Sequence, residues 1–91
     1  MYYTELQLAK ILNKMYLDAP NGETIAMIHL FGIMFGELIK ENNYSITKIV
    51  KLSKINESYK TEVNKGVNLS KYVELKAKHE QYIADFLGDL I

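Results

Sequence analysis

Apolar side chains recur at helical spacing over residues 4–19, in the i, i+3, i+4, i+7, i+8 pattern of one helix face. These positions are Leu8, Ile11, Leu12, Met15 and Tyr16. Thr4 and Gln7 precede them as a capping box, in which a hydroxyl and an amide satisfy two backbone donors at a helix start. Residues 20–22 read Pro-Asn-Gly, which ends a helix and favours a turn. The pattern therefore predicts a first helix over residues 4–19.

The next stretch contains an uncharged run, MIHLFGIMFG at residues 27–36, within a predicted helix from Glu23 to about Lys40. A membrane span needs about 20 apolar residues, so this interrupted run is too short. Apolar residues on every side of a helix indicate burial on every side. Gly32 and Gly36 share one face and let another backbone approach closely. We expect the central helix of a small bundle, with one face available to a second subunit.

Three shorter helices are expected after the central one. Ser45 caps a helix over 46–53, Asn56 caps another over 57–65, and Gly66 takes the left-handed position that follows a helix end. Residues 69–78 fit either an extended arm or the start of a C-terminal helix at about 79–90. The apolar positions of that last helix are Ile83, Phe86, Leu87 and Leu90. The fold class is all-α, a compact domain of four or five helices over residues 1–91.

Charge is distributed unevenly although the formal net charge is zero. Residues 45–78 hold eight lysines and three acids, for a net +5, between two acidic flanks. A basic middle indicates a polyanionic partner, and the alternative is a solvated lysine-rich surface that binds nothing. The chain has no cysteine, which removes disulfides, thiolate catalysis and cysteine-ligated zinc.

The basic middle includes SITKIVKLSKINESYKTEVNKG at residues 45–66. This stretch resembles the helix-turn-helix of bacterial transcription regulators, in which a first helix, a tight turn and a recognition helix follow within about twenty residues. Ile49, Val50 and Leu52 take the inward positions of the first helix, and Lys54 takes the turn position where glycine is preferred. Val50 also replaces the alanine that is usual at the tight helix crossing. Both substitutions bear on how closely the two helices approach.

A narrower resemblance is carried by IHLFGI (28–33), YKTEVNKG (59–66) and YVELK (72–76). Together these look like the small bacterial "HTH-like domain" proteins, over roughly residues 8–76. The resemblance implies the fold and a nucleic-acid connection, and it implies no particular activity.

On the predicted recognition helix, Tyr59 and Val63 face the core, so the opposite side is short and polar. The base-facing candidates are Asn56, Glu57, Ser58, Lys60, Thr61, Asn64 and Lys65. Asn64 suits adenine and the Thr61 methyl suits thymine. The candidates for phosphate contacts are Lys48, Lys51, Lys54, Lys71, Lys76 and Lys78.

Two features weaken sequence-specific reading of DNA. The chain lacks arginine, which makes the commonest specific contact to guanine, and Glu57 and Glu62 place negative charge on or beside the polar face. Weak or AT-biased binding is therefore as compatible with the sequence as specific binding. The alternative is a protein-interaction module of helix-turn-helix shape. DNA binding is favoured if lysines form an open face, and the alternative is favoured if Glu57, Glu62 and Glu74 occupy that face.

No catalytic motif is present, and His29 and His79 are too far apart along the chain to form a metal motif. We expect His29 to be a hydrogen-bonded core histidine. The start MYYTELQLAK lacks the pattern of a signal peptide. The sequence thus predicts a cytoplasmic, homodimeric, DNA-binding helix-turn-helix protein, a transcriptional regulator or an accessory of a mobile-element or defence locus. It predicts no enzyme activity, cofactor, metal or membrane partner.

Overall fold

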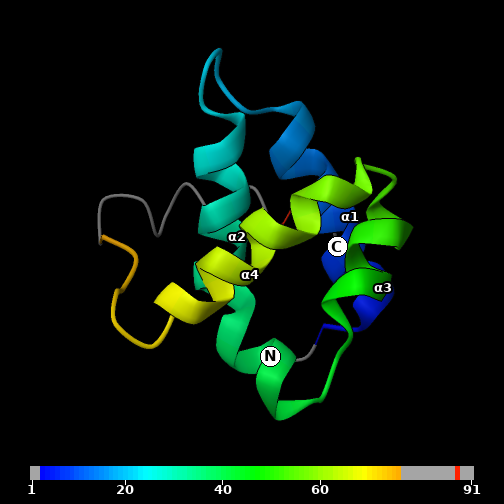
Figure 1. Cartoon of the computed structure of the whole chain (residues 1–91), viewed down its shortest axis with the longest axis vertical. Coiled ribbons are helices and arrows are strands. Elements are labelled where there is room, and N and C mark those ends of the chain that lie inside the picture. Colours follow the sequence, from blue (N-terminus) through cyan, green and yellow to red (C-terminus); the bar gives the residue numbers. More distant parts are fainter. Residues whose placement is uncertain (1–2, 77–87, 89–91) are drawn as a thin grey trace.

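The computed structural model describes residues 3–76 and residue 88. The helices are α1 (Glu5–Leu17), α2 (Thr24–Glu41), α3 (Ile46–Ser53), a 3-10 turn η1 (Glu57–Tyr59) and α4 (Lys60–Leu69). The described part contains no strand, so the all-α prediction is confirmed (Figure 1). The expected C-terminal helix at 79–90 lies, Gly88 apart, outside the described residues. Among the helices of residues 3–76, none has the length and apolar content that crossing a membrane requires.

The predicted capping box forms at the start of α1. The Gln7 backbone N–H donates to Thr4 Oγ1 over 3.1 Å, and the Thr4 N–H donates to Gln7 Oε1 over 2.8 Å. The helix ends at Leu17, two residues earlier than predicted, and the chain turns back through Gly22, whose φ is +84°. Glycine adopts that left-handed backbone without steric cost.

Helix α2 is central, as predicted, and no residue of its uncharged run 27–36 is exposed. Phe31 is fully buried, and Phe35 packs between Phe31 and Tyr3 with ring centroids 5.3 and 5.6 Å apart. The helix begins one residue later than predicted. Glu23 precedes it at the N-cap, and its side chain makes no capping hydrogen bond. Burial around α2 leaves little of this helix for solvent contact.

The prediction that α4 ends before Gly66 is wrong, because Gly66 lies within the helix, which continues to Leu69. A Cβ built on Gly66 would meet the His29 carbonyl oxygen and, at 2.9 Å, the Gly32 Cα. A Cβ on Gly32 would lie 2.6 Å from both Val63 O and Val67 N. Gly66 is thus a crossing residue, where two helix backbones touch, and it does not terminate the helix. The expectation that another backbone approaches Gly32 is confirmed, and its partner is α4.

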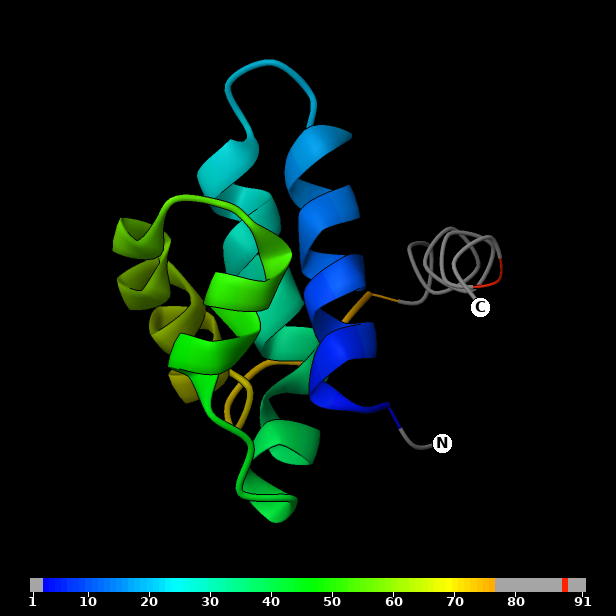
Figure 2. The same ribbon diagram turned by 90° about the vertical axis from the view of Figure 1, so that its right-hand side faces the viewer.

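Helix α3 packs chiefly on α1, as α4 does on α2 (Figures 1 and 2). Ile49 and Val50 are buried, with 0% and 1% of their surface exposed, so Val50 is accommodated in the core in place of the usual alanine. The prediction that Leu52 also faces inward is wrong, because Leu52 is 38% exposed and lines an open hollow along α1 and α3. Two polar contacts join the same helices. Asn13 Nδ2 donates to Ser53 O over 2.9 Å, and the Ser45 N–H donates to Glu5 Oε2 over 2.8 Å.

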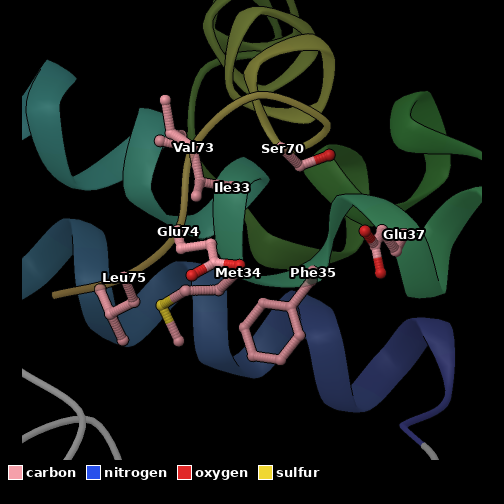
Figure 3. Close-up of a pocket in the computed structure, with 8 residues that line it drawn as sticks. All are labelled: Ile33, Met34, Phe35, Glu37, Ser70, Val73, Glu74 and Leu75. Carbon is pink, nitrogen blue, oxygen red and sulfur yellow. The ribbon is translucent and has the colours of Figure 1, made fainter. Parts of the chain in front are cut away.

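After α4 the chain turns at residues 70–72 and continues without regular structure to residue 76. Of the two alternatives for residues 69–78, the described part fits an arm. Figure 3 shows this segment meeting α2 around a hollow, with Ser70, Val73 and Leu75 opposite Ile33 and Phe35.

Candidate nucleic-acid interface

The turn between α3 and η1 has the geometry of a helix-turn-helix. Lys54 adopts a left-handed backbone with φ +66°, the conformation for which glycine is preferred. The Ser53 hydroxyl donates to Val50 O over 2.6 Å, and Ile55 is buried in the break. The departure from glycine at Lys54 therefore leaves the tight turn intact.

The recognition helix starts with η1 and continues as α4. Asn56 Oδ1 accepts from the Ser58 N–H over 2.8 Å, which confirms Asn56 as the cap of this segment. Val63, Gly66 and Val67 form its buried side. The residues predicted to face DNA bases are all exposed: Asn56, Glu57, Ser58, Lys60, Thr61, Asn64 and Lys65. The predicted division of this helix into a buried and a polar side is therefore present, while base contact stays a prediction.

Asn68 is an exposed polar residue of this helix that the sequence analysis missed. It lies one turn beyond Asn64, but the prediction had ended the helix before Gly66. The missing signal is the pairing of Gly66 with Gly32, because a glycine that a second glycine faces is better explained by a helix crossing than by a helix end.

Asn64 already makes one contact with its own helix, since Nδ2 donates to Lys60 O over 3.2 Å. An asparagine amide has two donor hydrogens and an acceptor oxygen, so this bond uses only part of its capacity. Asn64 therefore retains groups with which an adenine edge could be recognised.

The lysines predicted to contact phosphates differ in their surroundings. Those in the described part are exposed: Lys48, Lys51, Lys54, Lys71 and Lys76. Lys48 Nζ lies 3.2 Å from Glu5 Oε1, and Lys71 Nζ lies 5.1 Å from the Tyr72 ring centroid. Lys78 lies outside the described residues. The charge of Lys48 is therefore partly balanced by Glu5. Lys51 and Lys54 lie directly before the predicted recognition helix.

The two acids of the recognition segment differ as well. Glu57 is exposed at the start of η1, but the side chain of Glu62 is only 20% exposed. Glu62 Oε1 lies 2.7 Å from His29 Nε2 on α2, and Oε2 lies 3.2 Å from Lys65 Nζ. The hydrogen bond from His29, and then that from Lys65, hold the pKa of Glu62 below its ordinary value. The charge of Glu62 is thus compensated from within the protein. His29 is hydrogen-bonded, as expected, but it is not a core residue, because its side chain is 30% exposed.

Residues 4–76 match the family described as HTH-like domain. The chain belongs to this family. The match includes α1 to α4 and the left-handed turn at Lys54, and it begins at Thr4, the N-cap of α1. No curated protein and no solved structure matches the chain.

One hollow of the HTH-like domain, of about 380 Å³, adjoins the polar side of α4. Asn64 and Asn68 line it from α4, and Lys40 and Asn43 line it from the end of α2 and the turn that follows. Amides and a lysine beside a recognition helix suit hydrogen bonding to a polar ligand such as a nucleic-acid backbone.

Two larger hollows of the HTH-like domain have different linings. One of about 530 Å³ lies between α2 and the arm and includes the carboxylates of Glu37 and Glu74 (Figure 3). The other, of about 580 Å³, lies along α1 and α3 beside Leu6, Leu17 and Leu52. Within residues 3–76, no three His, Asp or Glu side chains gather as a metal site would require. Acids at the first hollow disfavour a polyanion there. The second hollow also has lysines in its lining, including Lys54, which belongs to the candidate surface formed by α3, η1 and α4.

Proposed function

We propose that the protein binds DNA through its helix-turn-helix unit and acts without catalysis, as a transcriptional regulator or an accessory of a mobile-element or defence locus. The observation that carries this proposal is the recognition helix: its polar residues are exposed, while its one half-buried acid, Glu62, is paired with His29 and Lys65. Membership in the HTH-like family supports it.

On this proposal the lysines supply most of the affinity, with Lys51 and Lys54 contacting phosphates, while Thr61 and Asn64 contact bases and Lys60 lies on the same base-facing side. Without arginine, the preference is expected to be for AT-rich duplexes. A cytoplasmic homodimer would place two recognition helices about 34 Å apart, in successive major grooves. Because lysine–phosphate contacts release counterions, affinity should fall steeply with salt.

The test is fluorescence anisotropy of labelled AT-rich and GC-rich duplexes, titrated with protein at low and moderate salt. Lys60→Glu is the main variant, because Lys60 is exposed and its substitution leaves the Glu62–Lys65 ion pair in place. Lys10→Glu is the matched control, since Lys10 is an exposed lysine on α1, outside the unit. Circular dichroism verifies that both variants fold.

Salt-dependent binding that Lys60→Glu weakens and Lys10→Glu preserves would support the proposal. Thr61→Ala and Asn64→Ala should then change the preference between duplexes and leave stability unchanged. Equal losses in Lys60→Glu and Lys10→Glu would indicate nonspecific attraction to net charge. Absence of binding at low salt from folded protein would contradict the proposal.

A second function is a protein-interaction module, and a separate observation favours it. Leu6, Leu17 and Leu52 are 51%, 69% and 38% exposed, and all three line the hollow along α1 and α3. Exposed apolar residues around a hollow are typical of protein contacts. If no duplex binds, these leucines rather than α4 become the surface to test.

A further inference from the structure

A histidine, a glutamate and a lysine meet where α4 crosses α2. His29 Nε2 and Lys65 Nζ each contact a different carboxylate oxygen of Glu62, at 2.7 and 3.2 Å. The His29 and Glu62 side chains are 30% and 20% exposed, whereas that of Lys65 is 58% exposed. Gly66 packs against the His29 backbone oxygen, so the helix crossing itself holds the imidazole beside Glu62.

The single negative charge of Glu62 interacts with two partners, His29 and Lys65. With a neutral imidazole, Lys65 is the one cation among the three groups, and their charges cancel. With an imidazolium, His29 alone balances the carboxylate, and the three groups carry a net +1. The more exposed partner, Lys65, is then the one whose charge is in excess.

Several other ionisable groups of the described part have partners of their own. Between Glu23 and Glu37, α2 carries no other ionisable side chain. From η1, Tyr59 pairs with Tyr16 of α1, and their hydrogen bond raises the pKa of Tyr59 above its ordinary value, so Tyr59 stays uncharged near neutral pH. Elsewhere in residues 3–76, ion pairs join Glu5 with Lys48 and Lys14 with Asp18. On α4, Glu62 is thus the charged group that His29 contacts, and Lys65 contacts the other oxygen of the same carboxylate.

We propose that His29 is a positioning residue that controls, through Glu62, how available Lys65 is to a DNA phosphate. This inference rests on the proposed function. Taking up a proton from solvent lets His29 satisfy Glu62 without Lys65, and the lysine turns to the phosphate. Because a proton on His29 frees Lys65 for the phosphate, DNA affinity should rise as pH falls.

One added phosphate contact should have a measurable effect on DNA binding. It should steepen the dependence of log affinity on log salt by about 0.9, and it should strengthen binding by up to about tenfold near 0.1 M salt. A purely structural role of His29 would change affinity or stability without changing that slope with pH.

The test is anisotropy of one labelled duplex at several pH values between 5.5 and 8, each over a salt series, with full-length protein. His29→Gln keeps a neutral donor toward Glu62 but cannot take up the proton. Its binding should lose the pH response and keep the shallow salt slope of the wild type at high pH. His79→Gln, which removes the chain's only other histidine, is the matched control and should respond like the wild type.

Three further variants complete the design. Glu62→Gln removes the competing charge, so it should show the steep slope at every pH. Lys65→Gln should show the shallow slope at every pH, and Lys65→Arg should restore the response. Retention of the full pH response in His29→Gln or in Lys65→Gln would overturn the inference while leaving DNA binding in place. Absence of binding by the wild type at any pH would instead remove the proposed function, and this inference with it.

Discussion

The two helices of the helix-turn-helix unit are held by different packing contacts, which we call their supports. Helix α4 crosses α2 where glycines let the backbones touch, whereas α3 packs on α1 through large side chains such as Ile49 and Val50. At the first contact there is no room for one more carbon atom. At the second, the space is filled by side chains that can be shortened one methyl group at a time. The first support sets the position of the recognition helix more rigidly than the second sets the position of α3.

The largest effect is expected from enlarging the glycine at the crossing. Gly66→Leu should lower the free energy of unfolding by about 3 kcal/mol or more, at or above the upper end for overpacked cores, because the obstructing atoms belong to the α2 backbone. In a domain of this size that corresponds to a loss of roughly 12 °C or more in melting temperature. Thermal unfolding followed by circular dichroism measures it.

Ala26→Leu is the matched control, because Ala26 is exposed on α2 and leucine suits a helix. It should melt within a few degrees of the wild type. If Gly66→Leu were equally stable, α4 and α2 could not be in backbone contact, and the contrast between the two supports would disappear.

At the α1–α3 contact the loss should grow with the volume removed, and its mildest variant should cost less than Gly66→Leu. Ile49→Val removes one methyl group from a fully buried side chain and should cost about 0.5–1.5 kcal/mol. Ile49→Ala should cost more, about 2–5 kcal/mol, so the response is graded with volume. Urea unfolding measures both. A loss from Ile49→Val as large as that from Gly66→Leu would mean that α3 is held as rigidly as α4.

Much of this fold could be predicted from sequence, because its signals are local. The capping box of Thr4 and Gln7, the Ser45 and Asn56 caps and the apolar spacing of α1 each depend on residues a few positions apart. Gly66 was misplaced because its role depends on Gly32, which is distant in sequence. A glycine near an expected helix end has the same local signature whether it ends the helix or faces another backbone.

In the candidate site, too, the local features could be predicted from sequence and the contacts between distant residues could not. Exposure of Thr61 and Asn64 followed from helical periodicity, since Val63 between them had to be buried. The pairing of Glu62 with His29 could not be predicted from periodicity, because the two residues lie on different helices and meet only where these helices cross. An acid that counted against DNA binding in the sequence is thereby compensated in the structure.

Low pH should weaken both helix contacts. At the α1–α3 contact the affected carboxylate is that of Glu5, and at the α2–α4 crossing it is that of Glu62. Hydrogen bonds from the Ser45 backbone and from Lys48 hold the pKa of Glu5 below its ordinary 4.5, and His29 and Lys65 do the same for Glu62. A lowered folded-state pKa gives stability that is present above pH 4.5 and is lost as pH falls through the folded value. Stability in urea should therefore decline below about pH 4.5.

Glu5→Gln and Glu62→Gln should each make that decline shallower, and the double variant should combine the two changes, because the carboxylates share no partner. Both variants should be less stable than the wild type at neutral pH and approach it in acid. An unchanged acid response in both would show that neither carboxylate is stabilised by folding.

The smallest effect is expected on the outer side of α1. Leu17 is 69% exposed, so Leu17→Ser should change the free energy of unfolding by no more than about 0.5 kcal/mol in either direction. Urea unfolding at several protein concentrations measures it, with fully buried Leu12→Ser as the contrasting variant. A clear loss that grows with concentration would mean that a second copy of the chain covers Leu17. In that case the α1–α3 side is an assembly surface, and its exposed leucines are retained for contact between copies rather than for the stability of one domain.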